Sequence, residues 1–306
     1  MRVAITGGGG FVGGWLAEEL EASGHHVLRS AGREPDVTDP RAVFEWIHRS
    51  EPNAVVHLAG ISSAKAAAAD PARAIDVNVA GTVHVLEAAR AVDPRPVVLI
   101  PSSSEVYARP TAEELPLRED SRLGPRGPYA QSKLAQESVA LALGARSETP
   151  VVVARAFNHT GPGQSPDFVV PALAARVTAI TTGLATTIPV GNLDVARDVL
   201  DVRDVVRAYR LLIEGAATGV VRQGTVVNVS SGRSATIRDI LQRLCHAAGV
   251  QAPVEVDPTL VRPDEAPEIR GDPARIEGLV GWRPALSLQR TIDDVLKAAK
   301  DATGHP

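Results

Sequence analysis

The sequence predicts an α/β protein built around a doubly wound parallel sheet. In the first half of the chain, short apolar runs typical of buried strands alternate with segments whose apolar residues recur at helical spacing. A glycine cluster, TGGGGFVG (6–13), joins the first run to the first helical segment. This arrangement is typical of a Rossmann-type sheet that binds a dinucleotide. With 306 residues, the chain also has room for a smaller second domain.

The elements of the first half are defined by their boundaries as well as by their periodicity. The first helix stops at Gly24, and Asp39 and Pro40 supply a cap and a first residue for the second helix. The segment between the second strand and DVTD (36–39) is very short, so little room remains for a third strand. Strands are expected at 2–6, 25–31, 53–60, 96–104 and 150–157, and helices at 11–24, 41–50, 72–92 and 129–145.

The second half is more irregular. Residues 158–168 are loop-rich, 256–273 lack periodicity, and Thr236 with Asp239 resembles a capping box. Helices are expected at about 169–182, 201–215, after Thr236 and over 287–300, and strands near 186–190 and over 225–231. We expect a dinucleotide-binding domain over 1–157 and about 195–231, and a discontinuous α+β substrate-binding domain over about 158–194 and 232–306.

The composition argues against several classes of protein. Hydrophobic residues make up 44% and charged residues 22% of the chain, which argues against disorder. A net charge of −4 and 3% aromatic residues argue against nucleic-acid binding. Cys245 is the single cysteine, so no internal disulfide is expected, and no ligand spacing predicts a metal site. The sequence has no membrane-length apolar run and no signal-peptide pattern, so we expect a cytoplasmic protein.

The glycine cluster predicts the cofactor site. Gly7 permits a tight turn, Gly10 lets the backbone approach a pyrophosphate, and Gly13 lets the helix pack closely. Free N–H groups at the helix start would face the pyrophosphate. The alternative interpretation is an ordinary glycine-rich turn.

The end of the second strand bears on the choice of cofactor. The acidic residue that would bind a ribose 2′-hydroxyl is missing, whereas Arg29 and Arg33 are available for a 2′-phosphate. NADP(H) is therefore favoured over NAD(H), which stays possible, and solvated arginines are the alternative. Asp36 would suit an adenine amino group, or it forms a turn or a cap.

Tyr129 and Lys133 predict an acid–base site, because residues four apart share one helix face. A lysine ammonium beside a phenol favours the phenolate, so we expect the pKa of Tyr129 to fall below its usual ~10. Ser103 ends a buried strand at the edge where ligands of open α/β sheets bind, and its hydroxyl could bind a substrate carbonyl. Its neighbours Ser102 and Ser104 leave the register open by one residue, and three serines capping a loop are the alternative.

Other charged residues are candidates for the substrate site. Glu105 could abstract a proton or bind a sugar hydroxyl, or it is a surface carboxylate. Arg197 and Arg262 carry the group that binds a diphosphate in bidentate fashion, and Glu265 could accept hydrogen bonds from a ribose. Surface salt bridges are the alternative. His159 is a lone histidine, which is usually structural.

These motifs together resemble the extended short-chain dehydrogenase/reductase family of nucleotide-sugar enzymes (the NAD-dependent epimerase/dehydratase family) over nearly the whole chain. TGGGGFVG (6–13) resembles its cofactor fingerprint, and YAQSK (129–133) its tyrosine–lysine motif. HLAG (57–60) and DVNVAGT (76–82) resemble segments that line the cofactor and support the sheet. The segments most similar to GDP-4-dehydro-6-deoxy-D-mannose reductases, which form GDP-D-rhamnose, are FNHTGPGQ (157–164), VGNLDVARDVLDVRD (190–204) and RPDEAPEIRGDPARIEGLVGW (262–282).

The resemblance implies an NAD(P)-dependent oxidoreductase that reduces the 4-keto group of a nucleotide-linked 6-deoxyhexose, with a GDP-linked substrate favoured. Ser103, Tyr129 and Lys133 would be its catalytic residues. A 4,6-dehydratase that uses Glu105 as its base, a 4-epimerase with a retained NAD(P), and a non-catalytic NADP-binding sensor are the alternatives. Family members often dimerise through two helices, here about 75–92 and 129–145, so we expect a homodimer.

The resemblance also assigns binding residues to this chain. Besides the residues already named, those expected to bind the cofactor are Phe11, Val12, Val37, Leu58, Ala59, Gly60, Asn78, Phe157 and His159, together with Tyr129 and Lys133. Those expected to bind the substrate are Ser63, Ser104, Asn158, Val169, Asn192, Arg197, Arg262 and Glu265.

Overall fold

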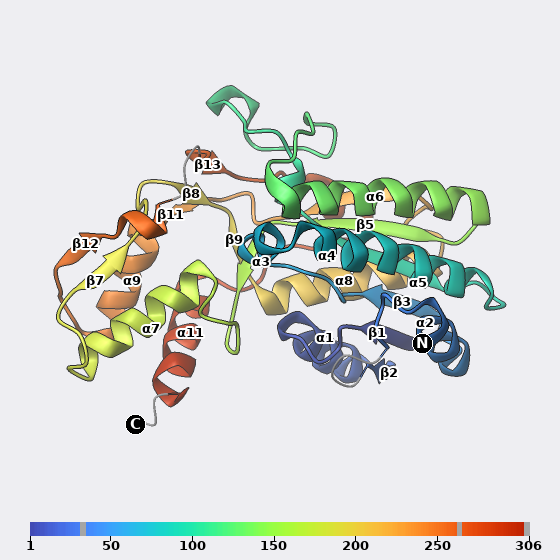
Figure 1. The fold of residues 1–306 in the computed structure, drawn as a ribbon, viewed down its shortest axis with the longest axis horizontal. Helices are drawn as coiled ribbons and strands as arrows, with labels where there is room; N and C mark the ends of the chain where they lie inside the picture. Colours follow the sequence, from blue (N-terminus) through green and yellow to red (C-terminus); the bar gives the residue numbers. More distant parts are fainter. Residues whose placement is uncertain (31–34, 262–264, 303–306) are drawn as a thin grey trace.

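The computed structural model describes residues 1–30, 35–261 and 265–302 (Figure 1). Over these ranges the main sheet has six parallel strands in the order β10-β5-β4-β3-β1-β2, which confirms the predicted fold class. The chain order reverses between β1 and β3, and this is where such sheets bind ligands at the carboxyl ends of their strands. The strands are β1 (Arg2–Thr6), β2 (His26–Arg29), β3 (Ala54–His57), β4 (Val97–Ser103), β5 (Val151–Ala156) and β10 (Thr225–Val229).

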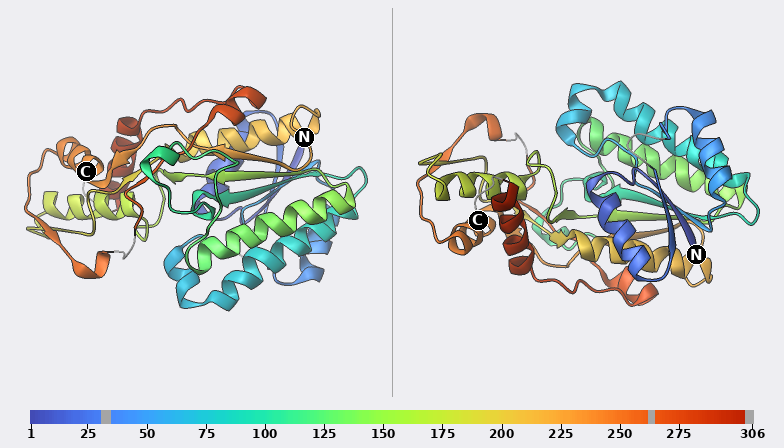
Figure 2. Two further views of the ribbon diagram at one scale, coloured as in Figure 1. Left: turned by 90° about the horizontal axis from the view of Figure 1, so that it is seen from above. Right: turned by 90° about the horizontal axis from the view of Figure 1, so that it is seen from below.

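Helices cover both faces of the sheet, as Figure 2 shows. Successive residues of β1 point to opposite faces: Val3 and Ile5 pack in one core cluster with Trp282, while Ala4 packs in another with Val85. The middle of a strand buried on both faces is expected to be apolar, as Val3, Ala4 and Ile5 are. One face carries α1 (Phe11–Ala22), α8 (Val202–Ala217) and α10 (Ala274–Val280); the other carries α2 (Pro40–Ser50), α3 (Ala64–Ala69), α4 (Pro71–Ile75), α5 (Gly81–Arg90) and α6 (Gly127–Ser147).

A second, smaller core lies apart from the sheet, on the left in Figure 1. Three helices, α7 (Val169–Thr181), α9 (Ile237–Ala248) and α11 (Leu288–Ala302), pack together there around Leu173, Ile240 and Ile292. The strand β7 (Ile188–Val190) adds Ile188 and pairs with β12 (Val254–Val256). The two cores are interleaved in sequence, because β10 and Trp282 of the first core follow α7 of the second.

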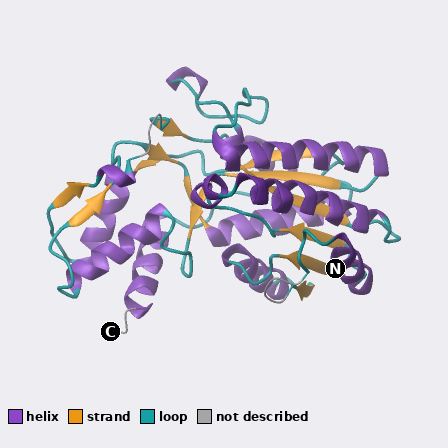
Figure 3. Ribbon diagram, in the orientation of Figure 1, coloured by secondary structure: helices purple, strands orange, loops and turns teal. Residues whose placement is uncertain are grey.

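Short strands and helical turns complete the described part of the chain (Figure 3). β6 (Asn158–Thr160) pairs with β9 (Val199–Asp201), and β8 (Ala196–Arg197) lies between β11 (Ala235–Thr236) and β13 (Glu268–Ile269). The helical turns are η1 (Asp76–Ala80), which is π-helical, and the 3-10 turns η2 (Ser104–Val106), η3 (Ala112–Glu114) and η4 (Pro258–Leu260).

Some predicted boundaries need correction. The helix expected over 72–92 runs through α4, the π-helical turn η1 and α5, and ends at Arg90. The second strand ends at Arg29, and β2 forms the sheet edge in the described part of the chain, in line with the little room expected for a third strand. The strands within 158–168 and 256–273 have two or three residues, too few for a periodic signal, and they form only through tertiary pairing.

Two predicted helix caps are confirmed. The Asp39 carboxylate accepts a hydrogen bond from the backbone N of Arg41 at 2.9 Å, and Pro40 is the first residue of α2. The Thr236 hydroxyl accepts one from the backbone N of Asp239 at 3.0 Å, at the start of α9. This is one of the two bonds of the predicted capping box; the Asp239 carboxylate accepts instead from an arginine one turn later. Each of the two cap bonds satisfies a donor that the first helical turn leaves free.

Two further findings concern membranes and metals, and both hold for the described residues. Within them, no helix combines the length and the apolar character needed to cross a bilayer. Nor do they contain a group of three or more His, Cys, Asp or Glu side chains placed to hold a metal ion.

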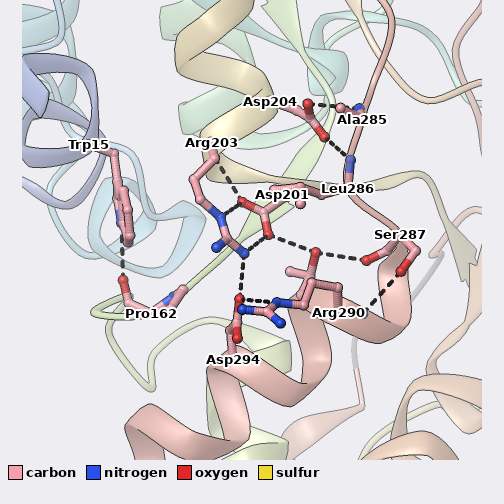
Figure 4. Close-up of polar contacts among 11 residues, drawn as sticks. Trp15, Pro162, Asp201, Arg203, Asp204, Ala285, Leu286, Ser287, Arg290 and Asp294 are labelled. Carbon is pink, nitrogen blue, oxygen red and sulfur yellow. Dashed lines mark hydrogen bonds and ion pairs between the residues drawn. The ribbon is translucent and has the colours of Figure 1, made fainter. Parts of the chain in front are cut away.

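A cluster of charges joins the two cores at the start of α8 (Figure 4). The Asp201 carboxylate accepts hydrogen bonds from the backbone N of Arg203 at 2.9 Å and from the Thr291 hydroxyl of α11 at 2.8 Å. The Arg203 guanidinium donates to Asp201 and to Asp294 of α11, both at 2.7 Å, and its carbon lies 5.8 Å from the centre of the Trp15 ring of α1. One guanidinium therefore contacts α1, the start of α8 and α11.

Candidate active site

The glycine loop has the shape of a dinucleotide-binding turn. Gly7 has a φ of +70°, and a Cβ there would lie 2.6 Å from the backbone N of Ala59. A Cβ at Gly13 would lie 2.6 Å from the carbonyl O of Gly7, so α1 packs closely against the loop itself. Gly10 precedes α1 without a side-chain cap, which leaves the first N–H groups of the helix for an anionic ligand. The loop therefore fits a pyrophosphate.

The segment 58–60 follows β3 and lies beside this turn. Asn78, from the π-helical turn η1, binds the next residue, Ile61. The Asn78 side-chain oxygen accepts from the backbone N of Ile61 at 2.8 Å, and its nitrogen donates to the Ser132 hydroxyl of α6 at 2.8 Å. Asn78 thus ties the expected cofactor-lining loop to the helix that carries the tyrosine–lysine pair. Ser63, expected at the substrate, accepts from the backbone N of Ala66 at 3.3 Å and caps α3.

The structure describes some of the residues expected at the adenosine end of the site. The Ser30 hydroxyl, directly after β2, accepts from a backbone N of the glycine loop at 3.0 Å. Asp36 forms a turn, because its carboxylate accepts from both the backbone N and the hydroxyl of Thr38. Val37 is buried. Arg33, on which the choice of NADP(H) depends, lies outside the described residues.

Ser103, Tyr129 and Lys133 meet where β4 ends and α6 begins. Ser103 is the last residue of β4, and its hydroxyl lies near enough to the Tyr129 phenol to lower the pKa of that group. Lys133 follows one turn later on α6, and its ammonium donates to the carbonyl O of Pro101 at 2.6 Å. The three side chains predicted to act together are therefore close together at the carboxyl edge of the sheet.

The pKa of Tyr129 moves against the predicted direction. Burial, and then the charge of nearby Glu105, raise the pKa of Tyr129 to about 12. Burial also lowers the pKa of Lys133 to about 8, although the charge of Glu137 raises it. The expected phenolate is therefore wrong: burial disfavours the charged form of both groups. Tyr129 is a protonated phenol at neutral pH, poised to give a proton.

The residues next to Ser103 have separate environments. Ser104 is buried in η2. Glu105 is exposed, and its backbone N donates to the Ser103 hydroxyl at 3.2 Å. The effect of its charge on the pKa of Tyr129 places its carboxylate within electrostatic reach of the phenol.

The segment 157–159 follows β5, and its side chains have different environments. Phe157 is 1% exposed and packs against Tyr107 and Leu117, so its place near the nicotinamide stays a prediction. His159 Nδ1 forms a hydrogen bond with the carbonyl O of Phe157 at 3.0 Å, and burial lowers the pKa of the imidazole, which keeps it neutral. Asn158 is exposed.

The two described residues expected to bind the nucleotide contact each other. The Arg197 guanidinium donates to the Glu265 carboxylate at 2.8 Å, and both side chains are mostly buried. Asn192 and Val169 are exposed. Arg262, the second expected diphosphate ligand, lies outside the described residues.

A buried polar network lies beneath the catalytic candidates, and the sequence analysis missed it. Ser102 donates to the Glu137 carboxylate, so its hydroxyl belongs to this network, and Ser103 stays the serine predicted to act with Tyr129. Glu137 forms an ion pair with Arg155 of β5 at 2.9 Å. One signal could have revealed the network: Glu137 follows Lys133 by four residues, so it shares the helix face of the predicted pair.

Comparison with known proteins decides the family. A family model described as GDP-mannose 4,6 dehydratase matches residues 31–295. The chain belongs to this family. Its membership confirms the resemblance to nucleotide-sugar enzymes of the epimerase/dehydratase type that the motifs indicate.

Individual relatives within and beyond this family match nearly the whole of the chain. It is 37% identical over 300 residues to GDP-6-deoxy-D-mannose reductase of Pseudomonas aeruginosa, an alignment that covers 96% of each chain. The structure of RMD from Pseudomonas aeruginosa complexed with NADPH is similar with a TM-score of 0.90 and 35% identity, over 98% of this chain and 99% of the other. The UDP-glucose 4-epimerase of Thermus thermophilus, in complex with NAD, is similar with a TM-score of 0.83 and 27% identity, over 99% and 100%.

Proposed function

We propose that this chain is an NAD(P)H-dependent oxidoreductase that reduces the 4-keto group of GDP-4-dehydro-6-deoxy-D-mannose to form GDP-D-rhamnose. Similarity over the whole chain to a GDP-6-deoxy-D-mannose reductase supports this substrate. The observation that carries the reaction type is the Tyr129 phenol beside the Ser103 hydroxyl, with a pKa that burial raises to about 12, so that the phenol is protonated at neutral pH. A reduction needs such an acid at the carbonyl oxygen.

In the proposed reaction, the ketone gains a hydride at carbon and a proton at oxygen, and becomes a secondary alcohol. The nicotinamide cofactor supplies the hydride when it is bound. Tyr129 donates the proton from its phenol, and Ser103 donates a hydrogen bond that orients the same oxygen. The positive charge of Lys133 stabilises the phenolate that remains until it takes a proton from solvent. The glycine loop and the start of α1 hold the pyrophosphate.

The test is the absorbance of NADPH mixed with the enzyme and freshly made GDP-4-dehydro-6-deoxy-D-mannose. We expect rapid, stoichiometric oxidation with this substrate and none with the dTDP-linked analogue. Absence of oxidation with both sugars would contradict the proposal. Equal oxidation of both would contradict the choice of nucleotide and leave the reaction type standing.

A dehydratase is the second candidate, and the position of Glu105 favours it. Its carboxylate is exposed and lies within electrostatic reach of Tyr129, where a base for the proton at carbon 5 would be needed. A dehydratase would convert GDP-mannose without net consumption of the cofactor. Incubation with GDP-mannose, followed by mass spectrometry for the loss of water, separates the two reactions.

We propose NADP(H) as the preferred cofactor, supported by the NADPH bound to a solved relative and by Arg29 and Arg33 in the sequence. Arg33→Ala should weaken the binding of NADPH much more than that of NADH, because only NADPH carries the 2′-phosphate. Fluorescence titration with both cofactors measures this. Equal losses for the two cofactors would remove the 2′-phosphate argument.

We also propose that the protein is a cytoplasmic homodimer whose subunits meet through α5 and α6. These helices lie on one outer face of the sheet, and Ile75, just before them, is 45% exposed. The two domains expected over 1–157 with 195–231, and over 158–194 with 232–306, would follow the two cores except at α10 and Trp282, which lie within 232–306 but pack in the first core. Light scattering at micromolar concentration measures the mass, and a monomeric value contradicts the dimer.

A further inference from the structure

Three titratable residues of α6 lie on one face of the helix at intervals of four. Tyr129 and Lys133 belong to the candidate active site, and Glu137 follows one turn later. The Glu137 side chain is 2% exposed, so its charge is not screened by solvent. It is therefore a fixed negative charge behind the ammonium of Lys133, and it acts on that ammonium electrostatically.

Arg155 holds the Glu137 carboxylate in a bidentate ion pair. Its Nε donates to the carboxylate at 3.0 Å and its Nη2 at 2.9 Å, while Ser102 of β4 donates from another side. Arg155 is itself fixed, because its Nη1 donates to the Tyr107 hydroxyl at 3.1 Å and to the carbonyl O of Glu119 at 3.0 Å. The two partners of the Glu137 carboxylate are therefore Ser102 on β4 and Arg155 on β5, and together they fix its position.

A buried ion pair is weak evidence of a role in stability alone, since apolar residues of similar volume often replace such pairs without loss. We propose that Glu137, held by Arg155, is a positioning residue that acts through Lys133 and keeps its ammonium charged beside the carboxyl edge of β4. This inference rests on the proposed function, which gives Lys133 its part in the reaction.

The groups around Lys133 determine in which direction its pKa moves when the Glu137 charge is removed. Its ammonium donates to the carbonyl O of Pro101 and to the side-chain oxygen of Gln136, both neutral. His57 of β3 is neutral as well, because burial and the lysine charge lower its pKa to about 3. The titratable or charged groups near Lys133 are His57, Tyr129, Glu137, Arg155 behind Glu137, and Glu105 near Tyr129. Glu137 is the one among them that raises the pKa of Lys133.

The experiment measures the protonation of Lys133 directly in Glu137→Gln. Acetic anhydride labels neutral amines, and mass spectrometry of the peptides gives the pH midpoint of each lysine. Lys65 and Lys297 are exposed and serve as internal references. We expect the Lys133 midpoint to fall by about one pH unit or more, the order of magnitude for unit charges one helical turn apart. The matched control is Glu19→Gln, which removes an arginine-paired carboxylate of α1 on the other face of the sheet, and it should leave the midpoint unchanged.

A folded Glu137→Gln whose Lys133 midpoint equals that of the wild type overturns the inference. If this variant does not fold, Glu137→Gln with Arg155→Met removes both charges of the ion pair. We then expect a smaller fall of the Lys133 midpoint, because the arginine charge that opposes the effect of Glu137 is lost as well, and no fall overturns the inference. A parallel pH profile of NADPH oxidation should show the high-pH limb of kcat/KM moving by the same amount. The labelling requires no turnover, so a wild type that oxidises no NADPH defeats the proposed reductase, while the labelling still decides the role of Glu137.

Discussion

Tyr129 and Lys133 lie one turn apart on α6, and Ser103 at the end of β4 meets the phenol, as their spacing and position in the chain predict. Patterns of this kind are local, so they can be read from the sequence. The direction of a pKa shift is not local, because it depends on how deeply the fold buries each group. Phe157 illustrates the same limit: its motif indicates the site, yet its ring lies in a hydrophobic cluster.

Tyr129→Phe removes the proposed acid and keeps the ring. We expect kcat for the reduction to fall by about 10²- to 10⁴-fold, the usual contribution of a positioned acid. Binding of NADPH, followed by its fluorescence, should stay nearly the same. Turnover equal to that of the wild type would show that another group gives the proton.

As the pH rises, the loss of activity should follow the deprotonation of Lys133, which occurs at a lower pH than that of Tyr129. Since kcat/KM reports groups of the free enzyme, its high-pH limb should lie near the Lys133 pKa of about 8, well below that of Tyr129 at about 12.

In the unfolded chain Lys133 keeps its proton up to its ordinary pKa of 10.5, so between about 8 and 10.5 the unfolded state binds more protons. The contribution of Lys133 to the free energy of unfolding therefore rises with pH across this window. Urea unfolding of the wild type and Lys133→Met at pH 8 and 10 tests the sign. An equal change with pH in both proteins would contradict it.

At the scale of secondary structure, the long strands and helices are predictable and most of the short ones are not, although β7 lies within the strand expected near 186–190. Val151–Ala156 of β5 and Ile237–Ala248 of α9 carry enough residues for their period and caps to be recognised. β8, β11 and β13 have two residues each and exist because three distant segments pair with one another. The segments that connect the two cores are therefore the part of the fold least visible in the sequence.

Two neighbouring glycines of α1 give a controlled test of the loop. A Cβ at Gly13 would collide with the carbonyl O of Gly7, whereas one at Gly14 would meet nothing within 4 Å. Gly13→Ala should weaken NADPH binding at least about tenfold, or about 1.4 kcal/mol, by displacing the loop. Gly14→Ala should bind normally and stabilise the helix by up to about 1 kcal/mol. Similar affinities for the two variants, measured by fluorescence titration, would refute the close packing at Gly13.

For the whole molecule, the charge cluster around Arg203 connects the first core to α11 of the second. The Asp201 side chain is fully buried, so loss of its cationic partner leaves a carboxylate short of donors. Arg203→Met should lower the free energy of unfolding by about 1–3 kcal/mol and raise KM for the nucleotide sugar. Thermal unfolding and steady-state kinetics measure both.

Arg290→Met is the matched control for this variant. Arg290 also contacts Asp294, but its side chain is 64% exposed, so its removal should change either quantity little. If the two variants behave alike, Arg203 does not hold the cores together.

The interleaving of the two cores has a consequence for synthesis. The ribosome releases α7 of the small core before β10, the outermost strand of the main sheet, and Trp282 of the same core emerges later still. Until β10 has emerged, β5 therefore lacks its outer neighbour in the main sheet, although α7 of the other core has already been synthesised. No single cut in the chain separates two foldable halves, so a stop codon anywhere before α11 leaves both cores unfinished or the second one open.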